Sequence, residues 1–194
     1  METNHQAVVV LVEPSGNINV GSVARLCKNF GIKELRLVAP KCETNSREAI
    51  QMAVKGKQLL QEAKEYSNLL EATSDCSKVI ATAGRKEQGR LIPLHQSKET
   101  FKWAAKAYGE GPIALVFGRE DSGLNNEELL LAQRIITLNT STDYQSLNLS
   151  HAVAIILNDF IKYKYNNSDS NLIIKKSDGL AKVKELNDCL IDAQ

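Results

Sequence analysis

The sequence has few cysteines, few aromatic residues and no excess of charge of either sign. Its four cysteines, Cys27, Cys42, Cys76 and Cys189, are scattered, with no Cys-x-x-C pair and no Cys/His pair at ligand spacing. We therefore expect reduced thiols rather than a metal site or a disulfide framework. Lys and Arg number 24 against 23 Asp and Glu. This balance excludes a basic coat over the whole chain but leaves room for a local basic patch.

Long apolar runs and the marks of a secretory signal are also absent. No segment approaches the ~20 apolar residues that a membrane-spanning helix needs. The apolar run at 7–12 has no basic segment before it, since Glu2 precedes it. At 194 residues the chain can form one domain with a substantial core. We expect a cytoplasmic protein with no membrane partner.

Several familiar motifs are missing as well. There is no G-x-G-x-x-G, which disfavours a dinucleotide-dependent oxidoreductase, and residues 118–123 lack the Gly-Lys-Ser/Thr of a phosphate-binding P-loop. No serine lies in a G-x-S-x-G elbow. His5 and His95 fall near expected loops, and His151 falls on an apolar helix. Packing is therefore the expected role of His151, and acid–base chemistry by histidine is disfavoured.

Apolar segments alternate with amphipathic ones along most of the chain. A short β-branched run predicts a strand at 7–12, and further, mostly apolar runs predict strands at 34–38, 78–82, 113–117 and 134–138. Helical spacing predicts helices at 19–30, 46–73 with an interruption at Gly56, 98–108, 125–132 and 146–161. Asn17 or Asn19 is the expected cap of the first helix. This alternation is typical of an α/β fold with a mostly parallel sheet flanked by helices.

Four polar or glycine-rich loops follow these strands, at 13–22, 82–90, 118–124 and 139–148. In a parallel sheet they project from one edge, where such folds bind ligands. Arg85 and Arg90 make the second loop locally basic, which suits phosphate contacts. Arg25 lies inside an apolar helix and therefore needs a partner. That partner is either a ligand or, in a purely structural interpretation, Glu120.

The last predicted helix and the tail raise a question of assembly. The helix at 146–161 has little polar face, so we expect burial on more than one side, with a second subunit as one source. A further amphipathic helix is predicted at 177–192. It packs on its own domain, forms a dimer contact or begins a second domain, and the sequence does not separate these alternatives.

Three motifs, in order, resemble those of a known family. They are Asn19-Val-Gly-Ser-Val-Ala-Arg25, Phe117-Gly-Arg-Glu-Asp-Ser-Gly-Leu124 and Ser146-Leu-Asn-Leu-Ser150. They are similar to the three motifs of the TrmH-like RNA 2′-O-ribose methyltransferases of the SPOUT superfamily. Val-Leu-Val-Glu-Pro near the start and Asn-Asn-Glu-Glu-Leu after the second motif make the resemblance closest to the TrmJ branch.

The resemblance implies a fold and a cofactor. The fold would be a SPOUT domain with a carboxyl-terminal trefoil knot at 1–163, a linker at 164–176 and a short helix at 177–194. The cofactor would be S-adenosylmethionine. Its expected binding residues are Thr82, Ala83, Gly84, Gly118, Leu138, Gln145, Ser146 and Leu147. They are mostly small or apolar, as suits a pocket that encloses adenine.

The resemblance also implies a reaction, in which a ribose 2′-hydroxyl of tRNA is methylated at anticodon-loop position 32 by a homodimer. The matching catalytic residues are Arg25, Asn19, Glu120, Ser146 and Asn148. Guanidinium stays protonated, so we interpret Arg25 as a cation that stabilises the alkoxide and is held by Asn19 and Glu120, while a neighbouring phosphate or water takes the proton. The expected RNA-binding residues are Arg85, Arg90 and Arg119. The alternatives are a ribosomal RNA 2′-O-methyltransferase and an RNA-binding module without catalysis.

Overall fold

A computed structural model describes residues 6–84, 93–105, 111–138, 140–141 and 146–168, the last five as backbone only. The chain divides into two units, Met1–Lys164 and Tyr165–Gln194. The second unit is described only where it ends the last helix. The predicted helix at 177–192 and most of the predicted linker lie outside the described residues. Among those that are described, no helix is long and apolar enough to cross a membrane.

The first unit is built on a seven-stranded sheet in which every pairing is parallel. The strands are β1 (Ala7–Val12), β2 (Glu34–Val38), β3 (Lys64–Tyr66), β4 (Lys78–Ala83), β5 (Leu94–His95), β6 (Ile113–Phe117) and β7 (Arg134–Thr137). Their spatial order is β3-β2-β1-β6-β4-β7-β5. The sheet is thus parallel, as predicted, and all carboxyl ends of its strands lie at one edge.

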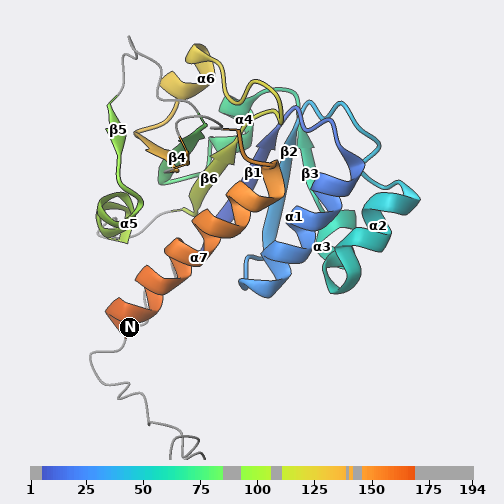
Figure 1. Ribbon diagram of the computed structural model, residues 1–194, viewed down its shortest axis with the longest axis horizontal. Helices are drawn as coiled ribbons and strands as arrows, with labels where there is room; N and C mark the ends of the chain where they lie inside the picture. Colours follow the sequence, from blue (N-terminus) through green and yellow to red (C-terminus); the bar gives the residue numbers. More distant parts are fainter. Residues whose placement is uncertain (1–5, 85–92, 106–110, 139, 142–145, 169–194) are drawn as a thin grey trace, which may run out of the picture. The chain divides into compact units, whose positions relative to one another are not determined.

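Helices cover both faces of this sheet (Figure 1). The helices are α1 (Asn17–Asn29), α2 (Arg47–Ala53), the 3₁₀ turn η1 (Val54–Gly56), α3 (Lys57–Gln61), α4 (Leu69–Thr73), α5 (Ser97–Ala105), α6 (Asn126–Leu130) and α7 (Leu149–Ser168). Alternate residues of β1 enter opposite cores. Val9 belongs to the core that includes residues of α1, α2, α5 and α7, and Val10 belongs to the core that includes residues of α4 and α6. Burial on both faces explains the uninterrupted apolar strands.

Two predicted elements are corrected by the structure. The segment at 46–73 is not one interrupted helix, because β3 (Lys64–Tyr66) interrupts it as the edge strand beside β2. β3 has only three residues, all with polar groups, so the sequence shows no apolar alternation that would predict a strand there. The predicted asparagine cap of α1 is also wrong, since the helix is capped by Gly16 without a side-chain hydrogen bond. Asn17 instead accepts from the Glu43 N–H and donates to Glu48.

The helix α7 begins at Leu149 rather than at Ser146. Asn148 fixes this start, because its Oδ1 accepts the Ser150 N–H at 2.9 Å. One side of α7 is buried against the sheet, and Phe160 meets Phe101 of α5 edge to face. Its other side carries His151, which is exposed, and Ile155, which is 41% exposed. Burial of α7 on a second side therefore stays a prediction about assembly.

Candidate active site at the carboxyl edge of the sheet

The loops that follow β1, β4, β6 and β7 meet at one edge, as the parallel sheet requires. Around β6 the chain folds back sharply on itself. The Arg119 N–H donates to the Gly123 carbonyl at 3.2 Å, and the Gly123 N–H donates back at 3.0 Å. A Cβ on Gly118 would lie 2.2 Å from the Gly123 carbonyl carbon. Glycine at 118 is therefore required for this turn.

Arg119 fastens the turn to two other elements. Its guanidinium pairs with Glu128 at 2.9 and 3.0 Å and with Glu13 at 3.1 and 3.2 Å. It also donates to the Gly123 carbonyl at 3.2 Å. The Arg119 hydrogen bond lowers the pKa of Glu13. Every guanidinium nitrogen of Arg119 has a partner inside the protein, so in this structure Arg119 holds the turn, and its contact with RNA stays a prediction.

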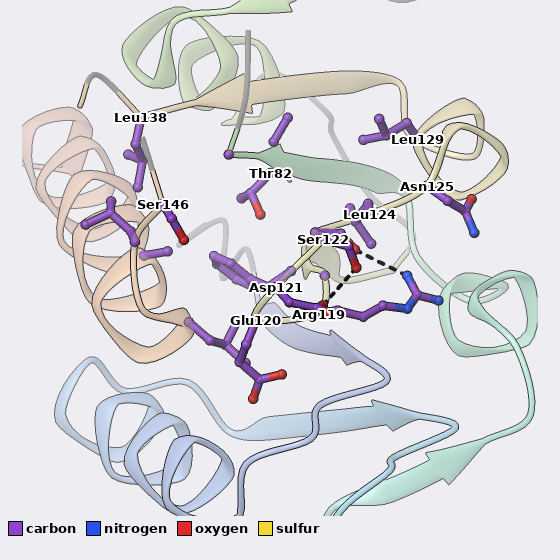
Figure 2. Close-up of a pocket in the computed structure, with 18 of the residues that line it drawn as sticks. Thr82, Arg119, Glu120, Asp121, Ser122, Leu124, Asn125, Leu129, Leu138 and Ser146 are labelled. Atoms are coloured by element: carbon purple, nitrogen blue, oxygen red, sulfur yellow. Dashed lines mark hydrogen bonds between the residues drawn. The ribbon is translucent and has the colours of Figure 1, made fainter. Parts of the chain in front are cut away.

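A cavity of about 360 Å³ lies beside this turn (Figure 2). It is lined by seven of the eight predicted cofactor residues: Thr82, Ala83, Gly84, Gly118, Leu138, Ser146 and Leu147. Gln145 lies outside the described residues. The volume of the cavity falls in the range of sites for small organic ligands. Residues from three separate loops thus meet as the sequence analysis expected.

Glu120 is the polar centre of the site. Its carboxylate accepts hydrogen bonds from the Ser15 N–H and hydroxyl, the Gly16 N–H and the Asn19 amide, all between 2.9 and 3.1 Å. Burial acts to raise the pKa of Glu120, but these donors outweigh it, and the pKa lies below its usual value. Glu120 therefore stays ionised and ties the turn after β6 to the start of α1.

A second, more open recess adjoins the cavity. Asn148 donates its amide to Asn19 Oδ1 at 3.0 Å, so the start of α7 is linked to the start of α1. The recess is lined by Asn19, Glu120, Thr140, Ser141, Ser146, Leu147, Asn148 and His151. Four of the five predicted catalytic residues are therefore gathered around one space. Seven of its eight lining residues carry polar side chains, which can form hydrogen bonds with the hydroxyls of a sugar.

Arg25, the fifth predicted catalytic residue, lies elsewhere. It is exposed on α1 and lines neither the cavity nor the recess. It forms no ion pair with any residue that the structure describes. The predicted pairing with Glu120 is wrong, because that carboxylate is already occupied by donors at the start of α1. Arg25 shares its outward stripe of α1 with Ile18, which is 53% exposed.

His151 also differs from its prediction. It is exposed in the first turn of α7 and lines the recess, so it does not pack in the core. The sequence did not predict this exposure, because most residues of α7 are apolar and His151 lies on the narrow face of the helix that points outward. Arg85 and Arg90, the other predicted RNA contacts, lie outside the described residues.

Sequence reasoning missed the residues that hold the site in place. Ser15 and Gly16 donate to Glu120, and Glu13 and Glu128 hold Arg119. The Asn125-x-x-Glu128 spacing signals a capping box, which the structure contains. The role of Glu13 has no such signal, since it depends on a left-handed backbone (φ 46°) that turns the chain after β1.

Comparison with known proteins gives the family. Residues 6–158 match the model of the SpoU rRNA Methylase family. The chain belongs to this family. The match spans β1 to the middle of α7, so it includes every loop of the cavity and the recess.

Several curated relatives of the chain are named as tRNA methyltransferases, and two of them serve as examples. The chain is 41% identical over 162 residues to the tRNA (cytidine-2′-O-)-methyltransferase TrmJ of Methanocaldococcus jannaschii, covering 82% of this chain and 69% of that one. It is 35% identical over 154 residues to the tRNA (cytidine/uridine-2′-O-)-methyltransferase TrmJ of Yersinia pestis. That alignment covers 78% of this chain but only 58% of the Yersinia enzyme.

Solved structures agree with the family. TrmJ from Z. mobilis ZM4 superimposes with a TM-score of 0.74 at 33% identity, over 80% of this chain and 68% of that one. The SpoU methyltransferase AviRb from Streptomyces viridochromogenes, solved in complex with the cofactor AdoMet, has a TM-score of 0.65 at 16% identity. It covers 83% of this chain and 58% of that one, and at this identity it shows a shared fold.

Proposed function

We propose that this chain is an S-adenosylmethionine-dependent methyltransferase that methylates a ribose 2′-hydroxyl of tRNA, at anticodon-loop position 32. The observation that carries the proposal is the adjacency of two spaces. The cavity and the polar recess share Glu120, Thr140, Ser146 and Leu147 as common walls. A small cofactor in one space and a ribose in the other would meet along that wall.

The cavity fits the expected cofactor. Ala83, Gly84 and Gly118 leave room, and Phe117 and Leu138 offer apolar surface for a planar base. Thr82 donates its hydroxyl to the Val116 carbonyl at 3.0 Å, so the lining is preformed there. When bound, S-adenosylmethionine supplies an electrophilic methyl group. The chain's own residues supply position and exclude water.

In the recess, Asn19, Glu120, Ser146 and Asn148 would hold the ribose. The Asn19–Glu120 and Asn19–Asn148 hydrogen bonds fix these side chains before the substrate arrives. Such preorganisation lowers the cost of orienting the 2′-oxygen. Arg85 and Arg90 remain the proposed contacts with the RNA backbone.

A homodimer completes the proposal. Arg25 would stabilise the developing alkoxide from the partner subunit, which is consistent with its absence from the lining of the cavity and of the recess in its own chain. Exposed Ile18 on α1 and Ile155 on α7 provide apolar surface for such a contact. The trefoil knot, the boundaries 1–163, 164–176 and 177–194, and a cytoplasmic location also belong to this proposal and rest on the family.

Methyl transfer with labelled S-adenosylmethionine tests the function. Bulk tRNA and ribosomal RNA would be offered separately, and the labelled product would be digested to nucleosides. A 2′-O-methylated nucleoside from tRNA is the expected result. Label in ribosomal RNA alone would favour the alternative that the family's description names. Cofactor binding without label in either RNA would favour an RNA-binding module.

A further inference from the structure

The recess holds two titratable side chains among the residues described, Glu120 and His151. This matters because the proposed reaction removes a proton from the ribose 2′-hydroxyl. Asp121 and Arg119 line the neighbouring cavity but not the recess. A proton acceptor supplied by this chain is therefore sought between Glu120 and His151.

Glu120 is poorly suited to accept that proton. Both of its oxygens already accept hydrogen bonds, Oε1 from Gly16 and Asn19 and Oε2 from the backbone and hydroxyl of Ser15. Donors of this kind stabilise the ionised carboxylate and make it a weaker base. Protonation would also break the contacts that hold the turn after β6 to α1. Glu120 is thus a structural anion of the site.

His151 is placed differently. Asn148 caps α7, and His151 lies three residues further along, on the same side of the first turn. Asn148 is itself tied to Asn19, so the turn that bears His151 is fixed relative to the rest of the recess. The imidazole is exposed and makes no ion pair or hydrogen bond with any described residue. No described residue therefore occupies its ring nitrogens, which can meet a substrate in the recess.

Resting on the proposed function, we infer that His151 is the proton acceptor for the ribose 2′-hydroxyl. The unprotonated ring nitrogen takes the hydroxyl proton as the 2′-oxygen forms its bond to the methyl carbon. The bond from that carbon to sulfur breaks, and its electron pair stays on sulfur. The products are the methyl ether, the neutral thioether and imidazolium, which returns its proton to water. Arg25 retains its proposed role as a cation, which guanidinium chemistry permits.

The inference predicts a particular pH profile. Histidine side chains titrate between about pH 5 and 8, and only the neutral ring can accept a proton. Glu120 is the other charged group that lines the recess among the described residues, and the next turn of α7 presents apolar Ala154 and Ile155. Because only a neutral ring accepts the proton, the single-turnover rate of methyl transfer should rise with pH and then level off.

The test compares the wild-type chain with His151→Gln and His151→Asn, which keep a polar side chain but no base. We expect a rate at pH 7.5 that is lower by about 10²–10⁴-fold, the usual scale for a general base, and loss of the rising limb. S-adenosylmethionine binding, measured by calorimetry, should be unchanged, which separates this result from misfolding. Lys98→Gln, an exposed change on α5, is the matched control.

A second readout does not depend on turnover. In a ¹⁵N-histidine sample, the imidazole signals absent from His151→Gln are those of His151. They should shift when unmodified tRNA and S-adenosylhomocysteine are added to the wild-type protein. Active variants that keep the rising limb, or signals that do not move, would overturn this inference and leave the proposed function intact. A wild-type chain that methylates no RNA would overturn both.

Discussion

At the scale of single residues, the site depends on one carboxylate with four donors. Glu120 collects hydrogen bonds from Ser15, Gly16 and Asn19, and none of these residues is its neighbour in sequence. Hydrogen bonds to an ionised acceptor are stronger than those between neutral groups. Glu120 therefore stabilises the junction between the turn after β6 and α1 while remaining at the wall of the recess.

Replacing this charge should destabilise the protein. Glu120→Gln places an amide NH₂ group against donors and loses the charge-assisted bonds. We expect the free energy of unfolding to fall by about 1–3 kcal/mol, as measured by urea denaturation. Glu43→Gln, an exposed change without a side-chain partner among the described residues, should alter it by less than about 0.5 kcal/mol. Equal effects of the two substitutions would contradict the role of Glu120.

The same carboxylate predicts a dependence of stability on pH. Its pKa in the folded state is below the usual 4.5. Its contribution is therefore fully present above pH 4.5 and is lost as the pH falls through the lower folded value. The stability difference between wild type and Glu120→Gln should shrink as the pH is lowered from 5 toward 3. A difference that stays constant over this range would show that the charge is not responsible.

Residues at this scale were partly predictable. Asn19, Glu120, Ser146 and Asn148 could be assigned because the motifs fix their identity and the parallel sheet brings their loops together. The outward positions of Arg25 and His151 could not be assigned. Which stripe of a helix faces outward depends on the elements that pack against it, and both helices have apolar residues on most sides.

At the scale of elements, the turn at 118–124 connects the cavity to α6. Arg119 holds Glu13 after β1 and Glu128 in the first turn of α6, and Glu128 also accepts the Asn125 N–H at 2.8 Å. The turn, the end of β1 and the start of α6 thus form one ionic junction. Of its two carboxylates, that of Glu128 is the more shielded, with 14% of the side chain exposed against 30% for Glu13.

Arg119→Lys tests whether this residue positions the loop or contacts RNA. Lysine cannot reproduce the paired contacts to two carboxylates. We expect the dissociation constant for S-adenosylmethionine to rise about tenfold, equivalent to about 1.4 kcal/mol, in a calorimetric titration. A contact with RNA phosphate predicts the reverse pattern: unchanged cofactor affinity and weaker, less salt-dependent binding of tRNA. That pattern would support the interpretation based on sequence.

The elements themselves were predictable where the pattern is strong. β1, β2 and β6 occupy the ranges that their short apolar runs predict. The division of segment 46–73 into short helices and β3 could not be predicted, because it depends on contacts with residues far away in the sequence. Arg36 of β2 is buried and donates to the Ala72 carbonyl at 2.6 Å and to Asp75, and its hydrogen bond lowers the pKa of Asp75 to about 2. Such contacts anchor α4 independently of helical periodicity.

At the scale of the whole molecule, the proposed dimer makes a prediction about mixed chains. Arg25→Ala alone should abolish methyl transfer and leave cofactor binding intact. Glu120→Gln should also reduce transfer strongly. Random pairing of the two variants makes half of the dimers heterodimers. If each site takes Arg25 from one subunit and Glu120 from the other, each heterodimer has one intact site. Mixing the two unfolded variants and refolding them should restore about a quarter of wild-type activity.

The outcome separates two arrangements of the site. Activity that stays absent in the mixture, with both variants folded and dimeric by light scattering, would place Arg25 and Glu120 in the same subunit. A monomeric wild-type protein with full activity would contradict the dimer altogether.

Locating the transferred methyl group on the RNA is the most direct test of the proposed tRNA ribose methylation. An unmodified tRNA transcript would be incubated with the wild-type chain and S-adenosylmethionine, cut with a nuclease and mapped by tandem mass spectrometry. The proposed function predicts one methyl on a ribose 2′-oxygen, at anticodon-loop position 32. A methyl on a base nitrogen or carbon would contradict it, because the recess between Asn19, Glu120 and Asn148 would then not hold the reacting ribose.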